Sequence, residues 1–578
     1  MYCSNCGGEL NQGATFCPHC GAVQNEKKPV VPRSKNKAKW QELEMGGNWV
    51  PQPAGPGVQA AAKKKKQIIL IACAAALLLA AVLAFLLLNG TFSGGNAVEL
   101  SPIGAKYSED GSAYIILPED GSCIVIDGEI KFAAITADRK HVVVMQEDGT
   151  LYVTNKKLSK KTVIADNAEY IYGIRNDGFI YKNKNKNMGE YRVLFSDNIP
   201  IKLDMNTDFL SAMNTLSLVY VTQKGEIYTL SADSNDKVRI SSNAQDVELL
   251  GISDDGQTAF WSELVNGTPT LYLAENGIKE KLGEVSTYDS SFYGYARFSK
   301  DTEMATLASW YSDTMWIKKA GEAAVKVKLG SECTRPYYIC TESGPIDRAK
   351  AAKISSLYVS ASADEGMNLF YISSDGSRER ILSGVNDYVI ANGTIFYTDV
   401  DQNLYCGKLN KASISGEKRI ASEVYCFSAA QNGKYVYYMK DCADGFGDLF
   451  CFKTGSDSAQ KIGSDVAYYE TGYGYGWTCL HFSPDGGTVL YYIDTEIIPG
   501  TGSYNSSLMM WSYGDKAGVK IADDVIADSV SSARSTGDFD PKGFVFSKYS
   551  RVDSYNSLFV DWIYYDGKTM TRLAADVA

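Results

Sequence analysis

Four cysteines near the N-terminus have types and spacing that favour metal binding. They form two C-x2-C-G knuckles with ten residues between them, and the candidate ligands are Cys3, Cys6, Cys17 and Cys20. Two residues between thiolates allow one tight turn to present both to a tetrahedral ion, and the glycine after each pair permits a positive φ. Four thiolates leave no open coordination position. The pattern therefore predicts a structural Zn2+ site within residues 1–24.

Two such knuckles could also form a redox dithiol, an iron–sulfur site or a pair of disulfides. A reducing cytosol disfavours disulfides, and a thioredoxin-type dithiol needs a βαβ context that the sequence lacks. With Met1-Tyr2-Cys3 and Phe16-Cys17-Pro18 at the knuckles, the segment resembles the short zinc-ribbon heads at the N-termini of many bacterial membrane proteins. The resemblance implies a small docking or regulatory element for a cytoplasmic protein partner.

An apolar run follows further along the chain. Ile68–Leu88 has 21 residues and no charge. As a helix it would span roughly 31 Å, the hydrocarbon thickness of a bilayer. We therefore expect one transmembrane helix at residues 67–88, with the lipid bilayer as its partner. A cleaved secretory signal is the main alternative, but the run exceeds the usual signal core and no small-x-small site follows it.

Basic residues lie on one side of this run. Lys63–Lys66 precede it directly, and the first Lys or Arg on the other side is Lys106. We therefore expect a cell-membrane protein with a cytoplasmic N-terminus and an extracytoplasmic C-terminal part. The whole chain has a net charge of −11. Residues 1–66 have a net charge of +6, so residues 67–578 have a net charge of −17. Residues 25–66, rich in Pro, Gly and Ala, have the composition of a disordered basic linker.

Zinc ribbons also occur in nucleic-acid machinery, so a nucleic-acid role for the head is an alternative. Binding phosphate chains requires clustered Lys and Arg. The ribbon itself, residues 1–24, contains neither residue type, and the large C-terminal part is acidic. The charge pattern therefore argues against a nucleic-acid partner.

The remainder of the chain, residues 97–578, has the pattern of short strands. Runs of five to eight residues rich in Tyr, Val, Ile, Phe and Leu alternate with Asp-Gly, Asn-Gly and Lys-Gly turns. Such runs with tight turns are typical of hairpin-connected strands. We therefore expect a mainly β domain.

These runs repeat. Tyr107–Tyr114, Ile252–Phe260 and Phe482–Leu490 share the outline strand, Ser-x-Asp-Gly turn, strand, and Phe298-Ser-Lys-Asp-Thr-Glu keeps it without the glycine. In the second and third copies a third apolar strand and a mixed basic and apolar fourth strand come next; the fourth strands are Ile278–Leu282 and Gly518–Ile521. Four strands with a period near 40 residues are typical of β-propeller blades.

The Phe-Ser-Pro-Asp-Gly motif at 482–486 resembles the WD40-like repeat of TolB-type propellers. At about 40 residues per unit, roughly eleven or twelve units fit after residue 100, more than one ring usually holds. The expected fold is thus a β-propeller, either as one ring of about eight blades with long insertions or as two adjoining rings split near residues 345–350.

Catalytic motifs are scarce in this region. It has two histidines, His141 and His481, and no HExxH or Gly-x-Ser-x-Gly motif. This pattern argues against zinc proteases and Ser-His-Asp hydrolases. Asp399-Val-Asp401-Gln-Asn403 has alternating oxygen ligands, but the glycine and distant glutamate of a calcium loop are missing, so we expect a solvated hairpin. We therefore expect a protein that is not an enzyme.

Binding is better supported by the aromatic residues. Tyr473, Tyr475 and Trp477 alternate with glycines, and exposed aromatic faces on a flexible loop suit stacking on sugars or peptide side chains. The alternative is that they fill the edge of a blade core. The sequence thus favours a membrane-anchored scaffold that binds an envelope protein, peptide or glycan outside. An envelope hydrolase or lyase that uses propeller-face carboxylates is the competing hypothesis.

Cysteines in the strand region offer two further possibilities. The close pairs Cys333/Cys340 and Cys442/Cys451 could staple hairpins in an oxidising exterior. Equally, each could be a small buried residue within a strand.

Overall fold

The computed structural model describes residues 102–578, except 185–188, 204–208, 285–293, 310–312, 331–335, 363–365, 374, 471–475, 479, 528 and 531–538. The chain divides into two compact units, Met1–Glu99 and Leu100–Ala578, and the described residues belong to the second. The predicted zinc ribbon, basic linker and transmembrane helix therefore lie outside them. Among the residues described, no helix is long and apolar enough to cross a membrane.

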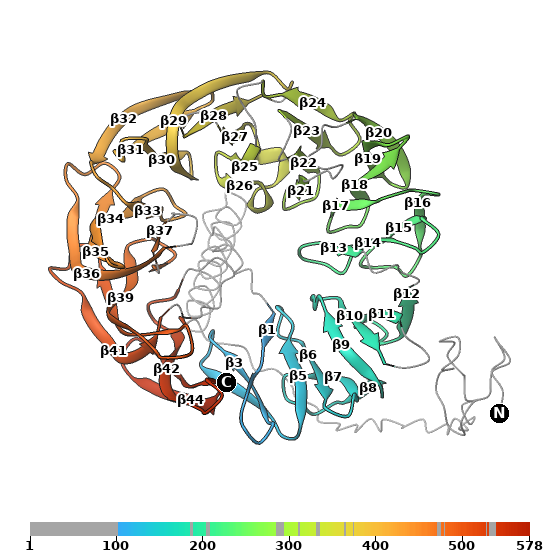
Figure 1. The fold of residues 1–578 in the computed structure, drawn as a ribbon, viewed down its shortest axis with the longest axis horizontal. Helices are drawn as coiled ribbons and strands as arrows, with labels where there is room; N and C mark the ends of the chain where they lie inside the picture. The colour runs from blue at the N-terminus through green and yellow to red at the C-terminus, as the bar shows by residue number, and fades with distance from the viewer. Residues whose placement is uncertain are drawn as a thin grey trace, which may run out of the picture. The chain divides into compact units, whose positions relative to one another are not determined.

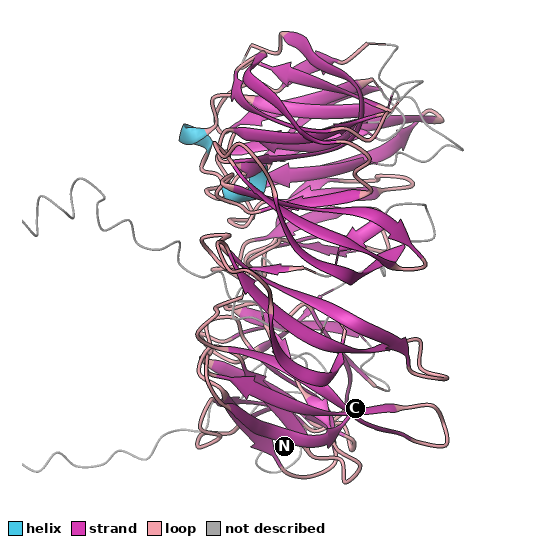
Figure 2. Cartoon of the chain, turned by 90° about the vertical axis from the view of Figure 1, so that its left-hand side faces the viewer, coloured by secondary structure: helices cyan, strands magenta, loops and turns pink. Residues whose placement is uncertain are grey.

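Nearly all of the described chain is antiparallel β-sheet, as the strand pattern predicts. Its helical elements are two short 3-10 helices, η2 (Ile346–Arg348) and η3 (Ala351–Lys353). Strands of the described residues form nine sheets. Figure 1 shows these sheets around a common centre, and Figure 2 shows them from the side, with both 3-10 helices at one face.

The N-terminal sheets, from β1 to β24, are separate units of three to five strands. Neighbours in each order are hydrogen-bonded: β1 (Ile103–Gly104), β5 (Ile130–Ile135), β6 (His141–Gln146), β7 (Leu151–Asn155), β8 (Thr162–Ala165); β2 (Lys106–Tyr107), β3 (Ala113–Leu117), β4 (Ser122–Ile126); β12 (Pro200–Leu203), β11 (Gly189–Leu194), β10 (Gly178–Asn183), β9 (Ala168–Tyr172); β13 (Phe209–Ser211), β14 (Leu218–Val221), β15 (Ile227–Leu230), β16 (Val238–Ser241); β17 (Glu248–Ile252), β18 (Thr258–Val265), β19 (Thr268–Glu275), β20 (Ile278–Glu284); and β21 (Gly294–Phe298), β22 (Met304–Ser309), β23 (Thr314–Lys319), β24 (Val325–Lys328).

The C-terminal sheets, from β25 to β44, are larger, with five to eight strands. Their orders are β26 (Gly344–Pro345), β25 (Pro336–Thr341), β27 (Leu357–Ser362), β28 (Met367–Ile372), β29 (Arg378–Ala391), β30 (Thr394–Asp399), β31 (Leu404–Asn410), β32 (Ser413–Ala421); β33 (Cys426–Ala429), β34 (Tyr435–Ala443), β35 (Phe446–Lys453), β36 (Gln460–Glu470), β37 (Gly476–Thr478); and β38 (His481–Phe482), β39 (Thr488–Ile497), β40 (Tyr504–Ser512), β41 (Val519–Ile526), β42 (Phe544–Val552), β43 (Leu558–Tyr565), β44 (Met570–Val577).

Long strands explain the larger sheets. The 14-residue β29 pairs with β28 through its first half and with β30 through its second, so one strand serves two four-stranded units. Gly384 lies between the halves with φ 63°. Asp465 in β36 and Asp524 in β41 have φ values of 54° and 60°. A residue in the left-handed region thus marks each of these strands.

The repeated Ser-x-Asp turn lies between the first and second strands of a unit, as predicted. In the copy at 252–260, the Ser253 hydroxyl donates to the Asp255 carboxylate, whose Oδ1 also accepts the Gln257 N–H at 3.0 Å. The Ser483 and Asp485 pair repeats the first of these bonds at 2.6 Å. The turn's hydroxyl and backbone N–H groups thereby donate to its own Asp side chain instead of to water.

Outer strands contain the predicted mixture of basic and apolar residues. The predicted fourth strands at 278–282 and 518–521 correspond to β20 and β41. In β20, the Lys279 ammonium lies 3.9 Å from the centroid of the Tyr272 ring on the preceding strand. Lysines on an exposed edge strand disfavour pairing with another chain. The cation also covers an aromatic face of its own sheet.

The apolar core lies between successive sheets. One buried cluster joins Met315 and Val327 of β23 and β24 to Val359 and Phe370 of β27 and β28. The first and last sheets also contact each other: the Tyr107 and Ala578 backbones exchange hydrogen bonds of 3.4 and 2.9 Å. Ile116 of β3 packs with Val545 and Val577 of β42 and β44.

Candidate functional site

The predicted site residues fall mostly outside the described residues. Cys3, Cys6, Cys17 and Cys20 lie there, as do Tyr473 and Tyr475. Trp477 lies in β37, where its backbone pairs with that of Tyr469 in β36. Residues 471–475 come between β36 and β37 in the sequence, and Figure 1 places β37 on the inner side of its sheet. The ligand-binding prediction for these three residues stays a prediction.

Both histidines of this unit occupy packed positions, as their strand context suggests. His141 stacks on Phe195 with ring centroids 4.2 Å apart and an interplanar angle of 6°. Burial lowers the pKa of His141, and the charge of Asp138 acts in the opposite direction. His481 is buried, with its Nε2 3.5 Å from the Tyr492 hydroxyl. Each ring is used in packing between strands.

The Asp399 hairpin is a turn stabilised by its own side chains. Asp399 Oδ1 accepts the backbone N–H groups of Asp401 and Asn403 at 3.0 and 2.8 Å. The Asn403 amide also donates to both carboxylate oxygens. These bonds satisfy the carboxylate without a metal. Within the described part of the chain, no group of three His, Cys, Asp or Glu side chains could hold a metal ion.

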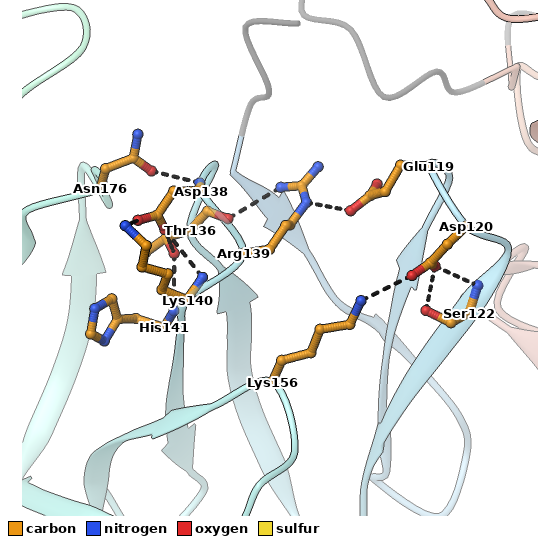
Figure 3. A network of polar contacts seen from close by, with 10 residues as sticks. All are labelled: Glu119, Asp120, Ser122, Thr136, Asp138, Arg139, Lys140, His141, Lys156 and Asn176. Carbon is orange, nitrogen blue, oxygen red and sulfur yellow. Dashed lines mark hydrogen bonds and ion pairs between the residues drawn. The ribbon is translucent and has the colours of Figure 1, made fainter. Parts of the chain in front are cut away.

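Polar contacts join the turns of neighbouring N-terminal sheets (Figure 3). Arg139 Nε donates to Glu119 Oε1 at 2.7 Å, and Lys156 Nζ lies 3.0 Å from Asp120 Oδ2. The N–H of Asp138 donates to Asn176 Oδ1 at 2.8 Å. The groups pair with one another across sheet boundaries, so the network connects sheets.

One carboxyl group has the pKa that acid–base chemistry near neutrality would need. Asp387 lies in the second half of β29, which pairs with β30. It keeps exposed surface, yet surrounding protein atoms desolvate its carboxylate and raise the pKa to about 6. The Tyr388 N–H donates to it at 2.7 Å. Among the described residues, no second carboxylate contributes to this shift.

Of the two alternatives for Cys442 and Cys451, the structure favours free cysteines over a hairpin disulfide. The register pairs Cys451 of β35 with Tyr437 of β34, five residues before Cys442. At about 3.3 Å per residue this puts the two cysteines roughly 16 Å apart, well beyond the Cα separation of about 7 Å that a disulfide allows. Both thiols are free, as is Cys340; its proposed partner Cys333 lies outside the described residues.

Inner strands carry an exposed tyrosine and cation–ring contacts that the sequence patterns did not reveal. Inner strand here means a strand that Figure 1 places toward the centre, as for β9, β13, β17 and β21, and also β5, whose inner edge pairs only with the two-residue β1. Tyr170 of β9 is 53% exposed, whereas most tyrosines of the sheets are packed. Lys131 of β5 and Arg297 of β21 place their cations 5.5 and 5.3 Å from the ring centroids of Tyr170 and Tyr295. Lys131 and Tyr170 are too far apart in the sequence for a motif to pair them.

A zinc-ribbon domain model matches residues 2–23, which include all four predicted cysteine ligands. The N-terminal head is therefore a zinc ribbon by sequence, and this supports the predicted zinc. Comparison with curated proteins found no match.

Several solved structures are distantly similar to the chain. The crystal structure of the tricorn protease is 11% identical with a TM-score of 0.30, and the match covers 82% of this chain and 58% of that one. A eukaryotic initiation factor is 12% identical with a TM-score of 0.38, covering 73% and 95%. The dihydro-heme d1 dehydrogenase NirN is 12% identical with a TM-score of 0.31, covering 74% and 73%. The chain thus spans little more than half of the tricorn protease, and TM-scores of this size carry no functional information.

Proposed function

We propose that residues 97–578 form a β-propeller and that this propeller is the binding domain of a membrane-anchored scaffold protein. The described strands form nine sheets, and the eight-stranded and seven-stranded sheets each contain two units, which gives eleven units. Contact between the first and last sheets supports one ring. The β25–β32 sheet crosses residues 345–350, which favours one ring over two.

The order of the segments supports the rest of the proposal. A zinc ribbon at 2–23 precedes the Lys63–Lys66 run and the apolar run 68–88. From this order we infer that the ribbon lies in the cytoplasm, where it docks a protein partner, and that the propeller lies outside. Zn2+ stabilises the ribbon by joining its four cysteines, because so short a segment has almost no core of its own. Because residues 1–24 contain no Lys or Arg, we propose no nucleic-acid partner.

The inner strands are the observation that carries the binding role. They present an exposed tyrosine with an adjacent cation, and Figure 1 shows several of them around one centre. Aromatic faces beside a few polar groups are typical of recognition surfaces. The outside ligand is therefore an envelope or secreted protein, peptide or glycan.

The topology and the metal can be tested in one preparation. The full chain, tagged at both ends, is expressed in bacterial cells, and protease is added to intact spheroplasts. We expect the C-terminal tag and propeller to be digested and the N-terminal tag to be protected. The membrane-extracted chain should contain one Zn2+, lost when Cys3→Ser and Cys6→Ser are combined. Protection of both ends, or an unchanged zinc content, would contradict the proposal.

An envelope hydrolase or lyase is the second candidate, and Asp387 is the observation that favours it. A carboxyl group with a pKa near 6 can exchange a proton at neutral pH. The usual glycosidase geometry pairs it with a second carboxyl group. The test is a turnover screen of the full chain on envelope glycans, with Asp387→Asn and the hairpin variant Asp401→Asn as its control. Turnover lost only in Asp387→Asn would replace the scaffold proposal with this one.

A further inference from the structure

Lys131 occupies an irregular position in its inner strand. In the pairing of β5 with β6, Ile130 faces Gln146 and Phe132 faces Met145, so Lys131 is an extra residue without a partner on β6. Such a β-bulge redirects the side chain of the extra residue. Lys131 is half-buried and reaches toward the next sheet rather than along its own.

The neighbouring inner strand has a bulge of its own at the point that Lys131 reaches. In β9, Tyr170 faces Lys182 and Ala168 faces Asn183, which makes Glu169 the extra residue. Lys131 Nζ donates to the Glu169 backbone carbonyl at 3.1 Å. The two bulges thus face each other across a sheet boundary and hold the ammonium in one place.

This contact leaves an aromatic surface open. The Lys131 ammonium lies 5.5 Å from the centroid of the Tyr170 ring, and 53% of Tyr170 remains exposed. Among the ion pairs of the described residues, none involves Lys131. Two of the three ammonium protons are therefore available to a ligand beside an open ring face.

A third inner-strand bulge shows that this arrangement is not a general property of the sheets. In β17 the extra residue is Leu250, which is 5% exposed and packs with Phe260 and Leu271. That bulge fills the core between sheets. The bulges of β5 and β9 instead place a cation beside an exposed tyrosine at a sheet boundary.

From this geometry we infer that the facing bulges of β5 and β9 bind an anionic saccharide, an inference that rests on the binding role proposed above. A pyranose ring stacks on the open face of Tyr170, and its carboxylate accepts a hydrogen bond from Lys131 Nζ. Stacking on an aromatic face suits the apolar face of a sugar, and a charged donor beside it selects an acidic one. A neutral glycan would stack on the Tyr170 ring but would offer no carboxylate to the Lys131 ammonium.

The test uses the full chain in detergent micelles, with oligogalacturonate as the anionic probe and a maltooligosaccharide of equal length as the neutral one. We expect saturable binding of oligogalacturonate that weakens with added salt, since screening reduces charge attraction. Lys131→Ala should weaken it about tenfold, the fold-change that loss of a charge-assisted hydrogen bond produces. Tyr170→Ala should weaken it about threefold to tenfold.

Conservative variants separate recognition from folding. Tyr170→Phe keeps the ring and Lys131→Arg keeps the charge, so both should bind within about threefold of the native chain. Lys157→Ala and Tyr555→Ala, changes at exposed residues on other turns, should leave binding unchanged. Equal binding by native chain and Lys131→Ala, or equal affinity for the neutral probe, would overturn the inference. If oligogalacturonate does not bind while zinc content and topology are as expected, the saccharide site is wrong and the scaffold proposal survives.

Discussion

The N-terminal and C-terminal sheets contain similar strands but are joined in different ways. Between N-terminal sheets the strands end, and charged side chains connect the units: Arg192 of β11 donates to the carbonyls of Ser231 and Ser234, the latter at 2.8 Å. Lys318 of β23 contacts Glu275 of β19 at 2.8 Å. Between C-terminal units, β29 runs from one unit into the next.

Among the C-terminal sheets, the side-chain contacts come from neutral groups and from Lys418 of β32, whose ammonium donates to the Ser456 carbonyl of the next sheet at 3.0 Å. Asn432 donates to the carbonyl of Asp485 at 2.6 Å, and the Tyr437 hydroxyl donates to that of Gly486 at 2.7 Å. The continuous strand β29 joins two units through backbone hydrogen bonds, whereas the separate N-terminal sheets meet through side-chain contacts, among them those of Arg192 and Lys318. Neighbouring units are thus joined in two ways, and the two kinds of join should respond differently to mutation and to pH.

The largest effect is expected at the buried cation of the N-terminal sheets. Arg192 is 1% exposed, and its removal in Arg192→Met leaves two carbonyls between sheets without their donor. We expect a loss of about 3 kcal/mol in unfolding free energy, since each unsatisfied buried group costs about 1–3 kcal/mol. Hydrogen exchange of the β9–β16 region measures the loss locally.

The matched control is Lys202→Met on β12, next to β11 in the same sheet and exposed. Lys202→Met should change the opening free energy that hydrogen exchange measures by no more than about 0.5 kcal/mol. Equal effects of the two substitutions would mean that the buried guanidinium does not hold these sheets together.

The two groups of sheets should also respond to pH in opposite directions. Burial lowers the pKa of His141, so the unfolded chain binds its proton more readily and the N-terminal sheets lose stability as the pH falls below about 6.5. Desolvation raises the pKa of Asp387 from 3.8 to about 6. The stability that this carboxyl group contributes to the folded chain is therefore complete below pH 4, and it is lost as the pH rises through 6.

Asp387→Asn removes the pH dependence of stability that comes from the Asp387 carboxyl group. We expect the variant to be more stable than the native chain by about 1.5 kcal/mol at pH 7.5, about half of the full linkage because the side chain keeps solvent contact. At pH 3.5 the two should be equal. Thermal unfolding at both pH values measures the difference, and a gain of the same size at both would contradict the role of the carboxylate charge.

Part of this comparison could be predicted from the sequence. The repeated Ser-x-Asp-Gly turn at Phe482–Gly486 and the basic fourth strand at Ile278–Leu282 lie where their patterns put them, because both depend on residues close in the chain. The zinc ribbon was also predictable, since its four ligands are the motif itself. Local chemistry determines these features.

The joins between units were not predictable. Arg192 and Ser234 are 42 residues apart, and Lys131 and Glu169 are 38 apart, so no window of sequence contains both partners. The bulge at Lys131 depends on how β5 pairs with β6, which composition does not specify. Whether Cys442 and Cys451 form a hairpin disulfide was open for the same reason, because only the register shows that the two thiols are far apart.

The residue between the two halves of β29 offers a test of the C-terminal joins. Gly384 has φ 63°, and a Cβ added there would meet only Val400 Cγ1 at 3.8 Å. Gly384→Ala should therefore cost about 1 kcal/mol, because the backbone conformation and not space opposes the side chain. Gly416→Ala is the control: it also has a positive φ, of 61°, but lies in the outer strand β32 at the end of its sheet. If β29 joins two units cooperatively, Gly384→Ala should raise hydrogen exchange in β25–β32 on both sides, whereas Gly416→Ala should raise it only near β31 and β32.

The smallest effect is expected where the N-terminal sheets have a strained turn. Thr302 occupies the position of the missing glycine in its Ser-x-Asp turn, with φ 61°, and its hydroxyl donates to Asp255 Oδ2 of the neighbouring sheet at 3.0 Å. Thr302→Gly relieves a backbone cost of about 1–2 kcal/mol but loses a solvent-exposed hydrogen bond worth about 0.5–1.5 kcal/mol and adds freedom to the unfolded chain. These terms nearly cancel, so stability should change by less than about 0.5 kcal/mol. Thr302→Val keeps the strain and removes the bond, and should therefore be destabilised by about 1 kcal/mol. If Thr302→Val is instead as stable as the native chain, the Thr302 hydroxyl does not help to join the two sheets.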